Sequence, residues 1–320
     1  MPKKSKNNKK RSYRRKQTHK NLKKMNCNPV SDKVNVPGSC YTEKALNLIR
    51  NAYNKNHDDK IKETNSKELV RELRTRLDEC PREDCWLKEI KDDDTRRQLD
   101  NIIFAPDRPN EWDKNPVSWL SNYDIAAVLK QYEKSHPKFK LLGPSPIDYN
   151  TILPDNNKCV WDDLCRLSLQ NLSYRNKRKL GVVFNLDKHD GPGTHWVSMF
   201  IDLDNKIIFY YDSAMNAVPR EVLKLKKEIM NQGKELDKPI DFRYIQNEYA
   251  HQSTNTECGM YSLFFIITFL TQKINHNIKK ELQLGGSKKL SIEKIIDIFT
   301  KPGINDEMMI NFRNKYFNKK

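Results

Sequence analysis

The stretch QSTNTECGMYSLFFIITFL, residues 252–270, is the most informative segment of this 320-residue chain. A polar loop, 252–257, runs directly into residues 258–270, which are apolar on nearly every side of a helix. A helix that is hydrophobic all round is buried in the core of a domain. The segment therefore predicts a buried helix that starts at Cys258, directly after an exposed loop.

The segments around this helix predict both strands and further helices. Residues 180–186, 195–203, 206–211 and 241–246 have the length and the β-branched and aromatic content of strands, and Asp204-Asn205 forms a turn between the second and third. Amphipathic patterns predict helices at 219–230, where Gly233 would act as the stop, and at 291–299 and 305–317. Strands and helices in no regular alternation favour an α+β fold.

The N-terminal third has a different character. Helical patterns cover 40–54, 66–77 and 84–102, and no strand-like alternation occurs before about residue 105. The proline-containing stretch 104–109 is a plausible boundary, and one further helix ends near Glu133. We therefore expect a disordered basic tail over 1–26, a helical arm over 27–108 and a core domain over 109–320.

Composition narrows the class of protein. The chain is 37% hydrophobic and 32% charged, so a sizeable core is possible. No apolar run approaches the ~20 residues of a membrane-spanning helix, and the N-terminus lacks the apolar region of a secretion signal. Seven dispersed cysteines without a CxxC pair indicate neither a disulfide scaffold nor a zinc site. We expect reduced cysteines in an intracellular protein with no membrane contact, no metal and no cofactor.

The net charge of +17 is concentrated at the N-terminus. Residues 1–24 contain 12 of the 59 Lys and Arg and no Asp or Glu, which leaves 47 basic and 42 acidic residues in the rest. Such a block binds polyanions by releasing counterions, and it also serves as a solubility or nuclear-import segment. Non-specific DNA or RNA contact through the tail 1–24 is thus one of two interpretations.

Cys258 has the position of a nucleophile. The first residue of a helix lies at the positive end of the helix dipole, which favours a thiolate. Gly259 follows it and leaves room for a substrate carbonyl to approach the backbone. A lone cysteine is more often a small core residue, so the assignment depends on a base and its partner.

His195 and Asp212 supply that pair. His195 follows a Gly-Pro-Gly loop at the start of one predicted strand, and Asp212 ends its hairpin partner, so the two side chains should lie at the same edge. His189 and His251 lie within loops and fit less well. Gln252, with the Cys258 backbone N–H, would form a two-donor oxyanion hole.

This order of residues resembles a known protease clan. His195-Trp196, Tyr211-Asp212-Ser213, Gln252 and Cys258-Gly259 are similar in order and spacing to the ubiquitin-like-protein proteases, including the SUMO deconjugases, and to the adenovirus-type cysteine proteases. A narrower resemblance, carried by segments such as Cys85-Trp-Leu87, 115–125, 193–196 and 304–317, is to the polyprotein-processing proteases of large nucleocytoplasmic DNA viruses, of the African swine fever virus type.

The resemblance implies a fold, a reaction and a location. The fold would be a SUMO-protease-like core with a central mixed sheet flanked by helices, preceded by the helical arm. The reaction would be cleavage after Gly-Gly in viral core or capsid polyproteins during virion maturation, in the host cytoplasm and the virion core. Alternatives are a deconjugase of SUMO or ubiquitin, and a nucleic-acid-binding virion protein with an inactive protease fold.

Two further features follow from the resemblance and the motifs. Trp196 matches a tunnel wall that excludes side chains larger than glycine, and Trp119 is a candidate for the opposite wall. Ordinary core packing is the alternative interpretation of both. Asn122 replaces an Asp that the SUMO proteases carry. Gly285-Gly286-Ser287 is itself a Gly-Gly-X sequence, so self-cleavage there competes with a flexible turn.

Overall fold

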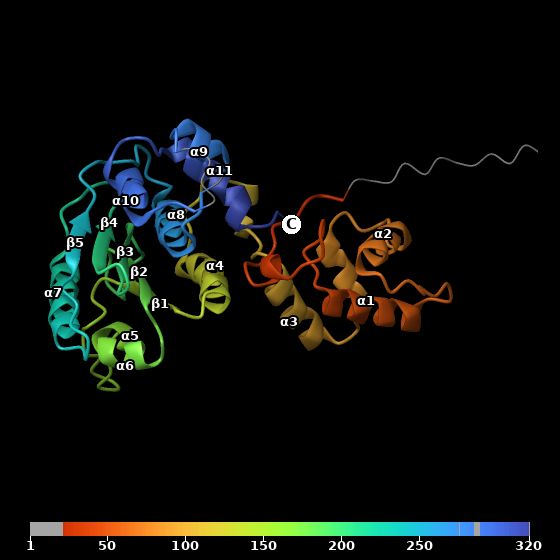
Figure 1. Ribbon diagram of the computed structural model, residues 1–320, viewed down its shortest axis with the longest axis horizontal. Coiled ribbons are helices and arrows are strands. Elements are labelled where there is room, and N and C mark those ends of the chain that lie inside the picture. Colours follow the sequence, from red (N-terminus) through yellow and green to blue (C-terminus); the bar gives the residue numbers. More distant parts are fainter. Residues whose placement is uncertain (1–21, 275, 285–288, 320) are drawn as a thin grey trace, which may run out of the picture.

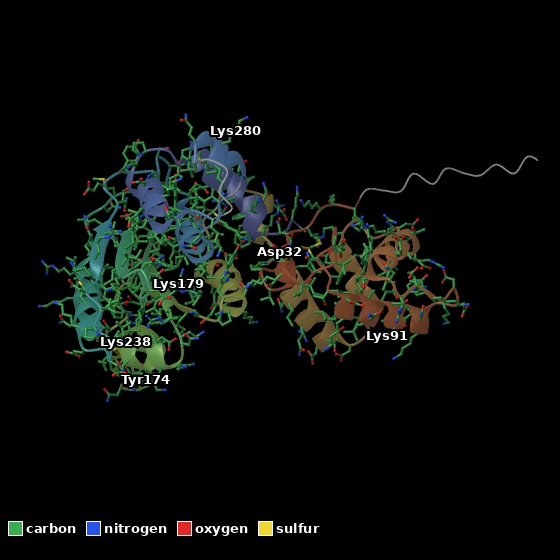
Figure 2. The ribbon with its side chains drawn as sticks, in the orientation of Figure 1. Asp32, Lys91, Tyr174, Lys179, Lys238 and Lys280 are labelled. Atoms are coloured by element: carbon green, nitrogen blue, oxygen red, sulfur yellow. A yellow bond between two sulfur atoms is a disulfide. The ribbon has the colours of Figure 1, made fainter. Side chains whose placement is uncertain are left out.

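The computed structural model describes residues 22–274, 276–284 and 289–319. The polypeptide forms two parts (Figure 1): a helical arm and a larger core built around one sheet. Exposed charged side chains, such as Lys91 on the arm and Lys238 and Lys280 on the core, lie at the periphery of both parts (Figure 2). Within the described residues, no helix is both long and apolar enough to cross a bilayer.

The arm packs its helices around stacked aromatic rings. Tyr41 stacks on Trp86 with the ring centroids 5.6 Å apart and meets Phe104 edge-on at 5.3 Å. The predicted helix over 84–102 is divided, because Asp92 caps a new helix by accepting a hydrogen bond from the Thr95 backbone N–H. The arm elements are η1 (Ser31–Lys33), α1 (Glu43–Asn56), α2 (Ser66–Arg76), η2 (Glu83–Glu89) and α3 (Asp93–Ile103).

The expectation of reduced cysteines is wrong for this structure. Six of the seven cysteines are paired in disulfides, and the remaining one, Cys258, is free and buried. The Cα–Cα separations of 5.1, 5.6 and 6.3 Å lie in the range of disulfides. The partners are only 13, 5 and 6 positions apart, and the overall low density of cysteines was misinterpreted as a sign of reduced thiols. The pairs are Cys27–Cys40, Cys80–Cys85 and Cys159–Cys165.

The C-terminal end of the chain fastens the arm to the core. The Asn318 amide donates to the carbonyls of Asn26 and Ala105, and its side-chain oxygen accepts from the Asn26 N–H. The Arg108 N–H donates to the Asn318 carbonyl. Asn26 therefore already belongs to the folded arm, whereas the expected tail extended through that residue; residues 1–21 lie outside the described part of the chain.

The core contains a mixed five-stranded sheet, as expected. The strand order is β1-β2-β3-β4-β5, with parallel pairs at both edges and antiparallel pairs in the centre. The sequence did not predict β1, because Gly143, Pro144 and Pro146 interrupt it; an edge strand tolerates prolines that a central strand does not. The strands are β1 (Phe139–Pro146), β2 (Lys179–Asn185), β3 (Trp196–Asp202), β4 (Ile207–Tyr211) and β5 (Arg243–Gln246).

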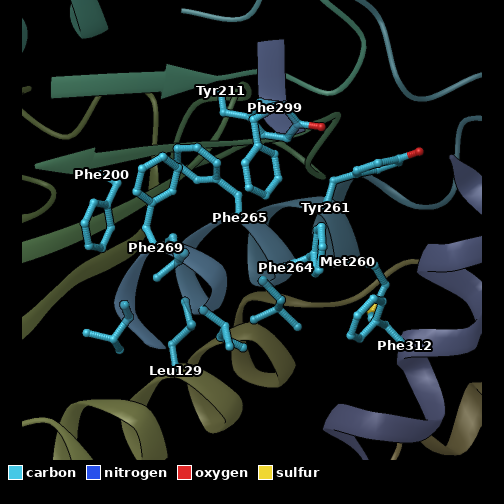
Figure 3. Close-up of a cluster of buried hydrophobic side chains, with 14 of the residues drawn as sticks. Leu129, Phe200, Tyr211, Met260, Tyr261, Phe264, Phe265, Phe269, Phe299 and Phe312 are labelled. Atoms are coloured by element: carbon cyan, nitrogen blue, oxygen red, sulfur yellow. The ribbon is translucent and has the colours of Figure 1, made fainter. Parts of the chain in front are cut away.

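Helices cover both faces of this sheet. Helix α8 packs against β3 on one face, where Phe200, Phe209 and Tyr211 meet Phe265 and Phe269 in an aromatic cluster (Figure 3). Helices α4, α10 and α11 complete that layer, and α5, α6 and α7 cover the other face. The predicted buried helix is thus confirmed: every residue from Cys258 to Leu270 is buried.

One predicted helix end is wrong. Gly233 lies inside α7, and a Cβ added there would lie 2.5 Å from a ring carbon of Phe242. This glycine permits close packing and does not stop the helix. The core helices are η3 (Asn110–Asp113), α4 (Asn122–Ser135), α5 (Asp162–Cys165), α6 (Leu169–Tyr174), α7 (Arg220–Lys234), α8 (Cys258–Thr271), α9 (His276–Glu281), α10 (Ile292–Thr300) and α11 (Asp306–Tyr316).

Candidate active site

The hairpin of β3 and β4 brings His195 and Asp212 together. His195 precedes β3 and Asp212 follows β4, and the pairing of Ser198 with Tyr211 aligns these two strand ends. The His195 Nε2 atom lies 2.6 Å from Asp212 Oδ1. A carboxylate only accepts hydrogen bonds, so the Nε2 proton points to Asp212 and Nδ1 remains for the sulfur.

Asp212 is held rigidly in place. It is 1% exposed, and its Oδ1 also accepts from the Ala214 N–H at 2.9 Å. Its Oδ2 accepts from the backbone and side-chain nitrogens of Asn216, both at 3.0 Å. Asn247, which follows β5, bonds both the N–H and the carbonyl of Asp212. These contacts fix the carboxylate and leave one direction for the histidine.

The surroundings of His195 favour the imidazolium. Burial lowers the pKa of His195, but the hydrogen bond to Asp212 and the neighbouring Cys258 side chain outweigh burial and raise it from 6.5 to about 9. Burial raises the pKa of Asp212, and the His195 contact together with the Ala214 and Asn216 donors lowers it below its ordinary value. Near neutral pH the pair is therefore an imidazolium beside a carboxylate.

Cys258 begins α8 next to this pair. Its residue is 1% exposed, and its sulfur is the single free thiol of the chain. A Cβ added to Gly259 would lie 3.1 Å from Leu120 Cβ and 3.4 Å from Trp196 Cδ1. Two side chains therefore occupy the space beside the residue after the nucleophile, and any residue larger than glycine would displace Leu120.

Gln252 is held within the loop before α8. Its Oε1 accepts from the Ser213 hydroxyl at 2.7 Å, and its own backbone N–H donates to the Ser213 carbonyl. Its Nε2 donates to the Thr254 carbonyl at 2.6 Å. A carboxamide nitrogen carries two protons, and this contact uses one of them. The second proton is the donor that an oxyanion would need.

Trp119 and Trp196 line one hollow beside the site. The indole N–H of Trp196 donates to the Leu120 carbonyl at 2.9 Å, so the segment that carries Trp119 is joined to the strand that follows His195. Trp196 is almost buried, whereas Trp119 is 44% exposed. The hollow measures about 560 Å³, and its lining includes Pro144, Asn185, Gly193 and both tryptophans.

The competing histidines are engaged elsewhere. His189 Nδ1 lies 2.7 Å from an Asp148 carboxylate oxygen. His251 lies between the Tyr211 hydroxyl, at 3.2 Å, and the Lys301 carbonyl, at 2.9 Å. Within the described residues, no group of three or more His, Cys, Asp and Glu side chains could hold a metal ion.

Sequence reasoning missed several supporting residues. Asn216 and Asn247 anchor Asp212, and Ser213 anchors Gln252, but an asparagine or serine in a polar loop carries no periodic signal. Asn185 accepts from the Thr194 N–H and so fixes the loop before His195. Proximity along the chain could have indicated two of them, because Ser213 and Asn216 lie one and four positions after the predicted carboxylate Asp212.

Comparisons with known proteins find similar cysteine proteases. Residues 176–319 match the family model described as Ulp1 protease family, C-terminal catalytic domain. The chain is 31% identical over 184 residues to a protein of Acanthamoeba polyphaga mimivirus assigned as a thiol protease, covering 56% of this chain and 56% of that protein. It is 28% identical over 183 residues to a cysteine protease of African swine fever virus, covering 54% of this chain and 64% of that protein.

A solved structure extends the likeness to the arm. The crystal structure of an African swine fever virus protease has a TM-score of 0.58 and 18% identity, covering 92% of this chain and 96% of the other. The two chains share a fold. The sequence matches span 56% and 64% of the length of these two viral relatives, and the family match starts beyond Trp119. Residues 176–319 are thus similar to the catalytic domain of the Ulp1 protease family.

Proposed function

We propose that this chain, which carries a Ulp1-type cysteine protease domain, is an active viral endopeptidase that cleaves after Gly-Gly in structural polyprotein precursors. The observation that carries the proposal is the 2.6 Å contact between His195 Nε2 and Asp212, with the free thiol of Cys258 beside the same ring. A nucleophile, a base and an orienting carboxylate are the parts that acyl transfer requires.

The reaction follows from the placement of the protons. The proton of the Cys258 thiol resides on Nδ1 of the His195 imidazolium, and the sulfur attacks the scissile carbonyl as a thiolate. The Cys258 backbone N–H and the Gln252 amide then stabilise the oxyanion. The imidazolium returns its proton to the leaving amine, and a water, activated by the same imidazole, hydrolyses the thioester. Asp212 accepts the Nε2 proton throughout and keeps Nδ1 directed at the sulfur.

The walls around Cys258 support Gly-Gly specificity. Cys258 is nearly inaccessible, and Leu120 and Trp196 lie where a side chain at position 259 would have to stand. A segment without side chains needs the smallest opening to reach such a sulfur, so two glycines before the cleaved bond suit this passage. Trp196 and Trp119 would form the two walls of the passage.

The likenesses support a viral client. Both sequence relatives are named as viral proteases, and the solved viral protease structure shares the arm as well as the core. We place the enzyme in the host cytoplasm and the virion core, with the tail 1–24 as a contact for DNA or RNA. A deconjugase of SUMO or ubiquitin is the second candidate, because the family model is that of the Ulp1 proteases.

An activity-based probe tests the proposal. A peptide that ends in Gly-Gly and carries a thiol-reactive warhead should label Cys258, located by mass spectrometry, and Cys258→Ala should abolish both labelling and cleavage of Gly-Gly-X peptides. A variant of an exposed lysine, Lys238→Ala, is the control and should behave as the wild type. Full cleavage by Cys258→Ala would refute the assignment.

The same experiment separates the alternatives. Faster release of a ubiquitin-like conjugate than of a viral precursor would favour the deconjugase. Absence of labelling and of hydrolysis, with DNA binding that is lost on deleting residues 1–24, would favour an inactive nucleic-acid-binding protein. The sequence Gly285-Gly286-Ser287 lies outside the described residues. Self-cleavage there would release a short C-terminal fragment from the active enzyme but not from Cys258→Ala.

A further inference from the structure

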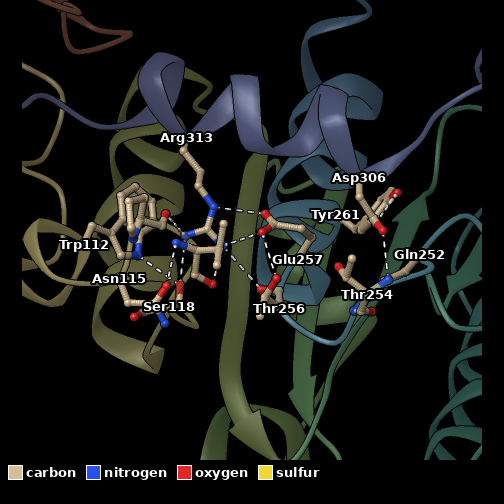
Figure 4. Close-up of polar contacts among 12 residues, drawn as sticks. Trp112, Asn115, Ser118, Gln252, Thr254, Thr256, Glu257, Tyr261, Asp306 and Arg313 are labelled. Atoms are coloured by element: carbon tan, nitrogen blue, oxygen red, sulfur yellow. Dashed lines mark hydrogen bonds and ion pairs between the residues drawn. The ribbon is translucent and has the colours of Figure 1, made fainter.

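Helix α11 holds the loop 252–257 at both of its ends (Figure 4). Asp306 and Arg313 are seven residues apart, two turns of helix, so they lie on the same face. Asp306 contacts the beginning of the loop and Arg313 contacts its end. The loop carries Gln252 at one end and leads into Cys258 at the other, so α11 touches the segment that supplies both the oxyanion donor and the nucleophile.

Arg313 joins the nucleophile helix to the wall segment. Its guanidinium donates to both carboxylate oxygens of Glu257 at 3.0 and 2.8 Å, and to the Ser118 carbonyl at 2.8 Å. It also reaches the Pro116 and Val117 carbonyls at 3.2 and 3.3 Å. Both charged side chains are almost completely buried, 3% and 0% exposed. One guanidinium thus fastens the residue before Cys258 to the residue before Trp119.

Asp306 holds the other end of the loop. One carboxylate oxygen accepts from the Ser253 N–H and hydroxyl, at 3.0 and 2.6 Å, and from the Thr254 N–H at 2.9 Å. The other oxygen lies 3.0 Å from the Tyr261 hydroxyl, which is also 2.9 Å from the His251 carbonyl. Thr254 in turn accepts from the Gln252 amide. The orientation of the Gln252 amide therefore depends on Asp306.

We propose that Arg313 and Asp306 are positioning residues that set two different parts of the site. Arg313 sets the distance between the substrate wall at Trp119 and Cys258, and Asp306 sets the Gln252 donor. A buried ion pair gives little net stability compared with an apolar pair of the same shape. A geometric role therefore explains the burial of the Arg313–Glu257 pair better than a stabilising role does. The catalytic meaning of these roles rests on the proposed protease function.

The two roles predict different kinetic changes. Arg313→Lys keeps the charge but loses the planar group that reaches Glu257 and the wall carbonyls at once. KM should therefore rise on the order of tenfold or more, and kcat should also fall several-fold as the sulfur shifts from the imidazolium. Asp306→Ala releases Ser253 and Thr254, so kcat should fall up to about 100-fold with KM nearly unchanged, because an oxyanion donor acts in the transition state.

A conservative variant separates positioning from simple loss of structure. In Asp306→Asn, the amide oxygen still accepts from Ser253 and Thr254. The new NH2 group donates to the Tyr261 hydroxyl, which then donates to the His251 carbonyl. Asp306→Asn should therefore restore kcat to within a few-fold of the wild type. Leu225→Ala in α7, buried on the other face of the sheet, serves as the control that lowers thermal stability without touching the loop.

The experiment measures kcat and KM on a Gly-Gly-X peptide, with the folded fraction taken from circular dichroism, and the rate of Cys258 alkylation by iodoacetamide. Arg313→Lys should slow alkylation several-fold, because the sulfur is no longer held beside the imidazolium, whereas partial unfolding, as in Leu225→Ala, would expose and accelerate it. Asp306→Ala should leave alkylation unchanged, since alkylation needs no oxyanion hole.

The outcomes distinguish this inference from the proposed function. If Arg313→Lys and Asp306→Ala change kinetics no more than the control, the positioning roles are refuted. If the wild type cleaves no Gly-Gly-X substrate, the proposed function fails, and the alkylation rate then tests Arg313 alone. Slower labelling of Arg313→Lys than of the wild type supports the positioning role of Arg313. Labelling at the rate of the wild type or of the control overturns it.

Discussion

Replacing Asp212 with Asn should change both the rate and the pH range of the reaction. One carboxylate oxygen accepts from His195 and Ala214, and the other accepts twice from Asn216. An asparagine must place an NH2 group against one of these pairs. Asn216 presents two donors and would oppose it, whereas the imidazole can become an acceptor by moving its proton to Nδ1. That tautomer cannot take the proton of Cys258.

The size of the effect follows from the pKa of His195. Raising that pKa from 6.5 to about 9 corresponds to about 3 kcal/mol of preference for the imidazolium. We expect Asp212→Asn to lose a large part of this preference, and kcat to fall by up to ~10⁴, the loss seen when a serine-protease histidine is held in the wrong tautomer. The imidazolium is the acid for the leaving amine, so activity falls as the pH rises through the pKa of His195.

The assay is the pH dependence of kcat/KM on a Gly-Gly-X peptide. In the wild type the basic limb should lie near pH 9, and in Asp212→Asn it should move by more than one pH unit toward 6.5. Asp202→Asn, at the far end of β3, is the matched control and should leave the limb in place. An Asp212→Asn enzyme with the wild-type limb and rate would refute the assignment of Asp212.

Three further variants test the walls and the disulfides. Gly259→Ala places a Cβ 3.1 Å from Leu120 Cβ, so Leu120 must shift and kcat/KM should fall at least tenfold in a peptide assay. Unchanged constants would show that the passage is wider than the structure indicates. Trp119→Ala removes an exposed wall and should raise KM about tenfold, 1.4 kcal/mol, with kcat retained, whereas an unchanged KM would place the substrate elsewhere. Alkylation of the denatured, unreduced chain should label one thiol, and seven labelled thiols would contradict the three disulfides. Cys27→Ser opens a disulfide that spans 13 positions, so it should lower the free energy of unfolding of the arm by about 3 kcal/mol in urea titrations.

Much of the fold was predictable because its signals are local. The buried helix α8, the hairpin of β3 and β4 and the arm helices follow from periodicity and side-chain type within short windows. Strand β1 was not predictable in this way, since its glycine and prolines break the pattern and only its place at the sheet edge makes them tolerable. Gly233 was wrongly interpreted as the end of a helix, because the residue that requires a glycine there, Phe242, lies beyond the helix.

In the candidate site, too, some features could be predicted from the sequence and others could not. The sequence by itself determined which residue types stand at His195, Asp212, Gln252 and Cys258, and that strand pairing would align the first two, because a hairpin forms from adjacent segments. Only the tertiary structure decided what holds them: Asn247 on Asp212, Asp306 on the loop, and Arg313 between Glu257 and the wall. Such contacts join segments up to 197 positions apart, and no short-range pattern encodes a distance that only the packing of the whole chain creates.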